Sequence, residues 1–124
     1  MQFAQTTGKG NFNFYNTGVG WKDATSVGAL STGKWYFFLG TWQAGNYIYL
    51  YIKSSDSSEV ATSSATISGT IAYDALSKLT IGRGYGDTAR STDGKQALHI
   101  VQSVFTSASQ ATNIFNQERH LFGV

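Results

Sequence analysis

The 124-residue chain contains no cysteine and no proline, and only 13% of its residues are charged. The lack of cysteine excludes a disulfide framework, a thiolate metal site and a cysteine nucleophile. Ordinary soluble domains are about 25% charged, so the surface polarity of this chain must come mainly from its 14 serines and 14 threonines. With 14 glycines and 15% aromatic residues, the composition favours strands joined by tight turns over a helical bundle.

Charge and hydropathy also narrow the range of partners. The formal net charge is +2 and the charges are scattered, so we do not expect nucleic acid as a partner. No stretch approaches the roughly 20 apolar residues of a membrane span, and residues 1–20 lack the basic start and apolar run of a signal peptide. We therefore expect a chain with no membrane-spanning segment.

The length is typical of a single domain, and a two-residue apolar period indicates strands along most of it. We predict one domain over residues 1–124, with strands around Phe12–Tyr15 and Trp35–Leu39. The strongest pattern is 47–52, where Ile48, Leu50 and Ile52 would face one side and Tyr47, Tyr49 and Tyr51 the other. The turn at residues 44–46 makes this a hairpin.

Beyond residue 52 the sequence predicts a serine-rich connection over 53–65 and a polar loop over 83–95. Further strands are predicted at 66–71, 78–81 and 96–105. The period then changes. Ser107 and Gln110 have the spacing of a capping box, and a 3.6-residue apolar stripe predicts a short C-terminal helix that ends near Gln117.

Several local patterns imitate catalytic or ligand sites. Residues 28–34 have the glycine and lysine spacing of a phosphate-binding loop, but Trp35 replaces the required hydroxyl and a strand pattern follows, so we reject nucleotide binding. His99 and His120 lack acidic neighbours at ligand spacing. The carboxylates do not form a pair of the kind that glycoside hydrolysis needs. We therefore expect no catalytic residue and no enzyme activity.

The same inspection gives no cofactor and no clear metal site. A calcium site built from Asp87 and Asp93 around the glycine cluster 82–86 is conceivable. Its signal is weak, because aspartates in such loops usually serve turn geometry.

The order of the motifs resembles a known family. Gly33-Lys34-Trp35, the strand to Thr41-Trp42, and then Gly45 with 48–52 resemble paired strands of concanavalin A-like, laminin G-like domains. Residues 79–82 are similar to that family's Leu-x-Ile-Gly strand, and 98–115 to its final strand and closing helical turn. The resemblance covers roughly residues 10–122. It implies an all-β, antiparallel two-sheet jelly-roll sandwich with a short C-terminal helix.

The chain departs from the family pattern in three places. Lys53-Ser54 replaces an Asp-Gly turn, and Ala97 stands where a glycine is expected. Met1 begins where such domains have completed their first strands. Three explanations for the missing first strands are open. A partner chain supplies the missing edge, the chain is part of a longer protein, or the fold is a reduced version of the family's sandwich. We expect self-association or docking on a larger assembly.

The resemblance implies non-catalytic recognition of carbohydrate or protein, often at cell or virion surfaces. Independently, the row of tyrosines could stack on sugars, anchor an interface, or cover a second layer of the same domain. The leading hypothesis is a lectin-like module with contact residues Trp42, Tyr47, Tyr49, Tyr51 and Tyr85. The alternative is a viral or phage structural protein, a capsid decoration or fibre domain, whose aromatic face is a subunit interface. An enzyme of the same superfamily ranks third.

Overall fold

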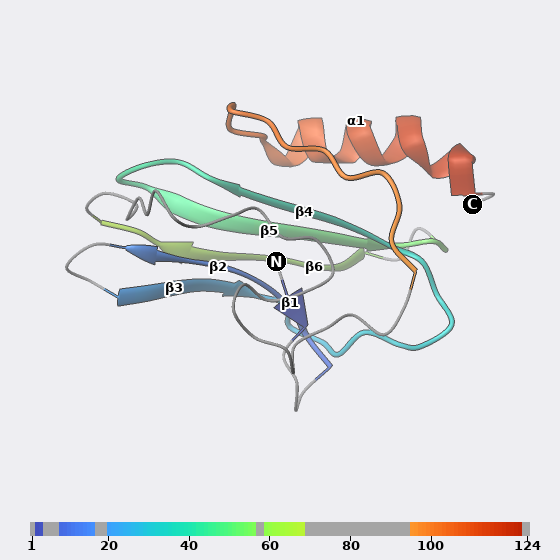
Figure 1. Cartoon of the computed structure of the whole chain (residues 1–124), viewed down its shortest axis with the longest axis horizontal. Helices are drawn as coiled ribbons and strands as arrows, with labels where there is room; N and C mark the ends of the chain where they lie inside the picture. The colour runs from blue at the N-terminus through green and yellow to red at the C-terminus, as the bar shows by residue number, and fades with distance from the viewer. Residues whose placement is uncertain (1, 4–7, 17–19, 57–58, 69–94, 123–124) are drawn as a thin grey trace. The chain divides into compact units, whose positions relative to one another are not determined.

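The computed structural model describes residues 2–3, 8–16, 20–56, 59–68 and 95–122. The chain divides into two compact units, residues 1–72 with 105–124, and residues 73–104. All the described strands and the helix belong to the first unit (Figure 1). Of the second unit, residues 95–104 are described, and they form neither strand nor helix.

The first sheet has three antiparallel strands in the order β1–β2–β3: β1 (Gln2–Phe3), β2 (Gly10–Asn16) and β3 (Gly20–Thr25). Phe12 pairs with Ala24 and Phe14 with Lys22 across β2 and β3. Because directly paired residues share a face, these positions form one side of the sheet. Phe12, Phe14 and Ala24 pack in the hydrophobic core, which identifies that side as the inner one.

The second sheet is also antiparallel, in the order β4–β5–β6: β4 (Tyr36–Trp42), β5 (Tyr47–Ser54) and β6 (Glu59–Thr66). The strand β5 is central and pairs along its length with both neighbours. Its Ile48, Leu50 and Ile52 are buried against the first sheet, as the alternation predicted.

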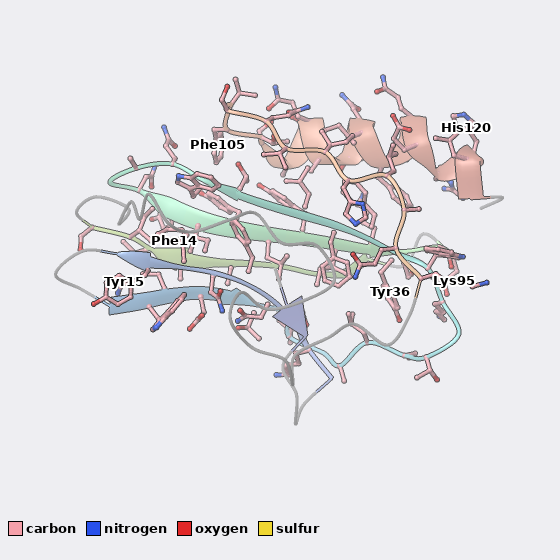
Figure 2. All side chains as sticks on the ribbon, in the orientation of Figure 1. Phe14, Tyr15, Tyr36, Lys95, Phe105 and His120 are labelled. Atoms are coloured by element: carbon pink, nitrogen blue, oxygen red, sulfur yellow. The ribbon has the colours of Figure 1, made fainter. Side chains whose placement is uncertain are left out.

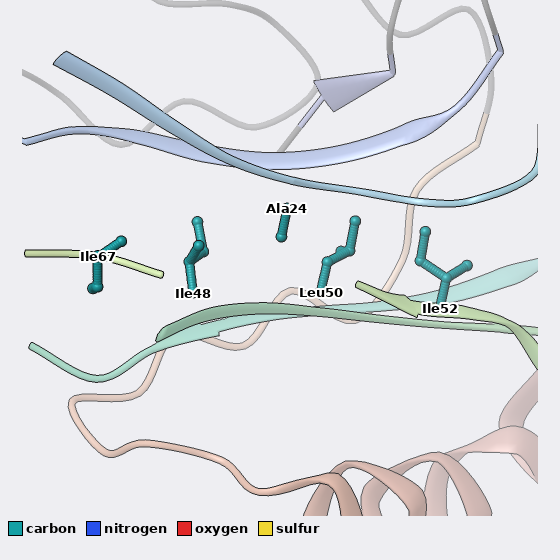
Figure 3. Close-up of a cluster of buried hydrophobic side chains, with 5 residues drawn as sticks. All are labelled: Ala24, Ile48, Leu50, Ile52 and Ile67. Carbon is teal, nitrogen blue, oxygen red and sulfur yellow. The ribbon is translucent and has the colours of Figure 1, made fainter. Parts of the chain in front are cut away.

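The core lies between the two sheets. Figure 3 shows its fully buried members, which come from β3, β5 and the residue after β6: Ala24, Ile48, Leu50, Ile52 and Ile67. Burial of each Ile or Leu side chain stabilises the fold by about 1.5–3 kcal/mol. The expected fold class is thereby confirmed: two antiparallel sheets enclose one apolar layer, and a short helix follows them.

Two glycines set the spacing between the sheets. A Cβ at Gly40 in β4 would lie 2.5 Å from the Phe12 ring, and one at Gly10 in β2 would lie 2.5 Å from Ile52 Cδ1. Cβ atoms essentially never lie so close to another heavy atom, so a side chain at either position would displace Phe12 or Ile52 from its place in the core.

The helix α1 (Ala108–Glu118) begins as predicted. Ser107 is its N-cap, and Ser107 and Gln110 form the reciprocal capping box. The helix ends one residue after the predicted Gln117, and a 3₁₀ turn, η1 (Arg119–Phe122), follows. Ala111 and Phe115 are its buried residues. The helix lies on the side of β4 and β5 that faces away from β2 and β3 (Figure 1).

Two predictions about strands were wrong. Residues 59–65, assigned to a serine-rich connection, belong to β6, because main-chain pairing with β5 does not require the apolar alternation that we looked for. Residues 96–105 form no strand in the structure. Both sets of alternating side chains there are exposed, and Leu98 has φ 53°, a left-handed conformation that ends an extended run.

Other predictions fall wholly or partly outside the described residues. Of the strand predicted over 66–71, Thr66 ends β6, Ile67 and Ser68 follow without strand structure, and the rest lies outside the described residues. The strand predicted over 78–81 and the glycine cluster also lie outside them. The sequence analysis missed β3, whose mixed residues Trp21 to Thr25 carry no clear apolar period.

Candidate functional site

The tyrosine row, Tyr47, Tyr49 and Tyr51, lies on the outer face of the second sheet. The Tyr47 and Tyr49 ring centroids are 5.6 Å apart, and those of Tyr49 and Tyr51 are 6.1 Å apart with planes only 4° from parallel. The three rings therefore form a row along β5, in which Tyr49 and Tyr51 are stacked and Tyr47 is tilted by 52° to Tyr49. This arrangement confirms that the tyrosines face away from Ile48, Leu50 and Ile52.

The C-terminal segment covers much of this row. The Phe105 ring contacts Tyr49 edge to face at 5.8 Å, and the Thr106 N–H donates a buried 3.0 Å hydrogen bond to Thr41 Oγ1 in β4. Tyr51 is only 7% exposed. Burial raises the pKa of its phenol above the ordinary 10.0, and the charge that Tyr49 can carry raises it further. Tyr49 and Tyr51 therefore pack against other residues of the same chain. Tyr47, at the end of the row, is 38% exposed.

The cover continues on α1. Phe115 packs against Phe37 of β4 with ring centroids 5.8 Å apart. Two cations lie over the same Phe115 ring, Lys53 Nζ at 5.5 Å and the Arg119 guanidinium carbon at 5.4 Å. Lys53 also donates a 3.3 Å hydrogen bond to Thr112 Oγ1. These contacts attach the helix to the outer face of β4 and β5.

Trp42 lies on the opposite face from the tyrosine row. It pairs with Ile48 across β4 and β5, and its ring contacts Phe12 at 6.2 Å and Phe14 at 6.1 Å, both in the first sheet. It is nevertheless 45% exposed, because it sits at the end of its strand. The structure thus does not gather Trp42 and the three tyrosines on a single surface.

Trp42 and Tyr47 lie at the β4–β5 hairpin tip, residues 42–47, on opposite faces of the sheet. The Gln43 N–H donates to the Tyr47 carbonyl at 2.9 Å, and Asn46 Nδ2 donates to Gln43 Oε1 at 3.2 Å. Gly45 has φ 70°, which allows the tight turn. The tip therefore presents two partly exposed aromatic rings, one on each side of a pair of side-chain amides.

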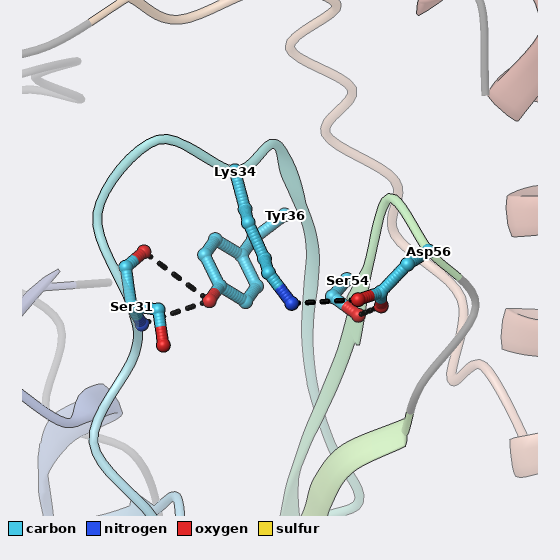
Figure 4. Close-up of polar contacts among 5 residues, drawn as sticks. All are labelled: Ser31, Lys34, Tyr36, Ser54 and Asp56. Atoms are coloured by element: carbon cyan, nitrogen blue, oxygen red, sulfur yellow. Dashed lines mark hydrogen bonds and ion pairs between the residues drawn. The ribbon is translucent and has the colours of Figure 1, made fainter.

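The opposite end of β4 and β5 carries the loop that imitates a phosphate-binding motif. Lys34 Nζ lies 2.6 Å from Asp56 Oδ2, and this hydrogen bond and the carboxylate charge raise the pKa of Lys34 (Figure 4). Ser54 Oγ donates to the other Asp56 oxygen. The Tyr36 hydroxyl accepts from the Ser31 N–H at 2.8 Å. A strand, not a helix, follows, as expected, so the loop has no helix N-terminus to hold a phosphate.

Within the described residues, no three His, Asp or Glu side chains lie close enough together to hold a metal ion. His99 Nε2 is 3.0 Å from Gln96 Oε1. The proposed contact residue Tyr85 and the weak calcium candidates Asp87 and Asp93 lie outside the described residues. In the part of the chain that the structure describes, no helix is long and apolar enough to cross a membrane.

The structure shows a second aromatic surface that the sequence analysis missed. Tyr15 pairs with Trp21 across β2 and β3, on the outer face of the first sheet, and both rings are exposed. The signal was hidden because β3 was not recognised as a strand. Without its register, Trp21 could not be placed beside Tyr15.

Comparison with known families agrees with this architecture. A laminin G-like family model, described as the concanavalin A-like lectin/glucanases superfamily, matches residues 1–110. No curated protein and no solved structure gave a match. Domains of this kind are generally non-catalytic binding modules. The match covers most of the chain and agrees with its two antiparallel sheets, so the protein belongs to the concanavalin A-like lectin/glucanase superfamily.

Proposed function

We propose that the protein is a non-catalytic, lectin-like recognition module that binds carbohydrate at the β4–β5 hairpin tip. The observation that carries the proposal is that two partly exposed rings, Trp42 on one face and Tyr47 on the other, flank the hydrogen-bonded amides of Gln43 and Asn46. Tyr47 contacts the half-buried Tyr49, which in turn stacks on the buried Tyr51. Tyr85 remains a proposed contact outside the described residues.

The chemistry of the tip suits a sugar. A sugar ring has an apolar face of C–H groups, which packs on an aromatic ring, and an edge of hydroxyls that need hydrogen-bond partners. Asn and Gln supply both donors and acceptors. Their mutual hydrogen bond orders the two side chains before a ligand arrives, which lowers the entropy cost of binding.

A glycan array followed by calorimetric titration tests this proposal. Trp42→Ala should weaken binding by about tenfold, as expected for loss of a stacking contact. Trp35→Ala is the matched control, because Trp35 is similarly exposed, 39% against 45%, but lies just before the other end of β4. Absence of glycan binding, or equal affinities for wild type and Trp42→Ala, would contradict the proposed site.

A second function, a structural subunit of a larger assembly such as a virion, is favoured by one observation. Residues 98–104 carry four apolar side chains that are half or more exposed, Leu98, Ile100, Val101 and Val104. Such an exposed apolar segment is typical of a surface that another chain covers. Light scattering on the purified chain tests it: a stable trimer or larger species supports this function, and a monomer at all concentrations opposes it.

A further inference from the structure

The outer face of β2 and β3 differs from every other surface described above in its combination of side chains. Register places six residues on it in three cross-strand pairs: Asn11 with Thr25, Asn13 with Asp23, and Tyr15 with Trp21. Figure 2 shows Phe14 and Tyr15 directed to opposite sides of β2, with Phe14 toward the second sheet. We call these six residues the β2–β3 outer face.

One end of this face is an aromatic platform. The Tyr15 and Trp21 ring centroids are 5.7 Å apart at an interplanar angle of 77°, an edge-to-face contact that holds both rings in place. Trp21 is 66% exposed and Tyr15 49% exposed. Neither ring belongs to the core cluster. An exposed pair of large rings fixed against each other offers apolar area to a ligand at little entropic cost.

The remainder of the face is a chain of ordered polar groups. Asn11 Nδ2 donates to Thr25 Oγ1 at 2.7 Å, and Asn13 Nδ2 donates to Asn11 Oδ1 at 2.8 Å. Asn11 is only 8% exposed, so these bonds fix its amide. The chain leads toward the aromatic platform and runs beside Asp23, which is exposed. Asp23 and the Asn13 carbonyl can accept hydrogen bonds, and the Thr25 hydroxyl can donate one.

The charge of the face selects among ligands. Asp23 is the only acidic or basic residue of the six. A carboxylate accepts hydrogen bonds from hydroxyl groups and repels an anion, so the face suits a polyol without negative charge. A neutral glycan meets both requirements, because its C–H face can stack on Trp21 while its hydroxyls reach Asp23 and Asn13. A sialylated or sulfated glycan does not.

We propose that the β2–β3 outer face is a binding surface for a neutral glycan, separate from the hairpin tip, with Trp21 as the stacking residue and Asp23 as the hydroxyl acceptor. The inference rests on the proposed function in one respect, that this protein binds carbohydrate. It differs from that proposal in the surface, the residues and the charge of the ligand.

The test uses the full chain and neutral hexasaccharides as probes: cellohexaose, laminarihexaose, maltohexaose and chitohexaose. The indole N–H signals of Trp21, Trp35 and Trp42 are followed by NMR during titration and assigned with single Trp→Phe variants. The signal of Trp21 should shift on addition of at least one neutral probe. This readout uses the native protein, so it does not depend on whether a variant folds.

Calorimetry on variants then separates the two proposed surfaces. Trp21→Ala should weaken binding of that probe by about tenfold, and Asp23→Asn should weaken it by several-fold. Trp35→Ala, outside both surfaces, serves as the control and should bind as wild type does. Urea midpoints close to that of wild type confirm that the variants are folded.

Each outcome decides between the proposals. Binding that is weakened by Trp42→Ala but not by Trp21→Ala, with no shift of the Trp21 signal, overturns the β2–β3 surface and leaves the hairpin tip. The reverse result supports the β2–β3 surface and overturns the tip. Binding of sialylated or sulfated glycans alone overturns the neutral-glycan inference while carbohydrate recognition stands. No binding of any glycan overturns both.

Discussion

The two outer faces of the sandwich carry similar side chains and differ in what covers them. On the second sheet, the Tyr49 ring packs against Phe105 of the C-terminal segment, Tyr51 is buried, and Phe115 of α1 packs against Phe37. On the first sheet, the rings of Tyr15 and Trp21 are exposed. An aromatic row along a strand is therefore not itself a sign of a binding platform. Its role depends on whether another element packs over it.

The largest effect is expected from removing the contact between α1 and the outer face of the second sheet. Phe115 is buried between α1 and β4, and Phe115→Ala should lower the free energy of unfolding by about 3 to 5 kcal/mol. The variant should also bind a hydrophobic dye, because Phe37 loses its aromatic partner. Leu121→Ala is the control: this side chain is 59% exposed, and its loss should change stability by no more than about 0.5 kcal/mol. Equal urea midpoints for the two variants would mean that α1 contributes nothing to this face.

A smaller change should remove a single hydrogen bond between the C-terminal segment and β4. Thr41 Oγ1 accepts the buried hydrogen bond from the Thr106 N–H, so Thr41→Val leaves that donor unsatisfied at nearly unchanged volume. We expect a loss of about 1 to 3 kcal/mol in urea unfolding. Thr41→Ser keeps the hydroxyl and should lose clearly less. If Val and Ser destabilise the protein equally, the hydrogen bond does not anchor the segment.

The smallest predicted effect is one of pH, and it reports on the cover without removing it. Burial and the neighbouring Tyr49 raise the pKa of Tyr51 above 10.0 in the folded state. The folded protein then holds this proton more tightly than the unfolded chain. The associated stability is fully present below about pH 10 and is lost as the pH rises through the folded-state pKa of Tyr51.

Absorbance of the phenolate during alkaline titration measures this directly. A late-titrating component should be present in the native protein and absent from Tyr51→Phe. The urea midpoint of Tyr51→Phe should also fall less steeply above about pH 10 than that of wild type. If the late-titrating component is still present in Tyr51→Phe, the tyrosine with the raised pKa is a different one.

The contrast between the faces also marks what the sequence could predict. The period of two placed Ile48, Leu50 and Ile52 in the core and the tyrosines opposite them, because alternation along a strand is a local property. The capping box placed the start of α1 for the same reason. The packing of Phe105 on Tyr49 was not predictable, since it joins segments more than 50 residues apart.

The errors have the same origin. β6 carries mostly small or polar residues, and it is a strand because its backbone pairs with that of β5. No side-chain pattern in the sequence predicts this pairing. Residues 96–105 have the alternation of a strand but lack one in the structure, because an extended segment becomes a strand only beside a partner. Trp21 was overlooked because its importance depends on the register between β2 and β3.

The cover of the second sheet also has a consequence for biosynthesis. Synthesis proceeds from the N-terminus, so all three strands of that sheet have been made before residues 105–118 leave the ribosome. During this interval Tyr49 lacks its contact with Phe105, and Phe37 lacks its contact with Phe115. The nascent chain therefore passes through a stage at which Phe37 has not yet gained the contact with Phe115, and a chaperone or a neighbouring nascent chain could occupy the place later taken by α1.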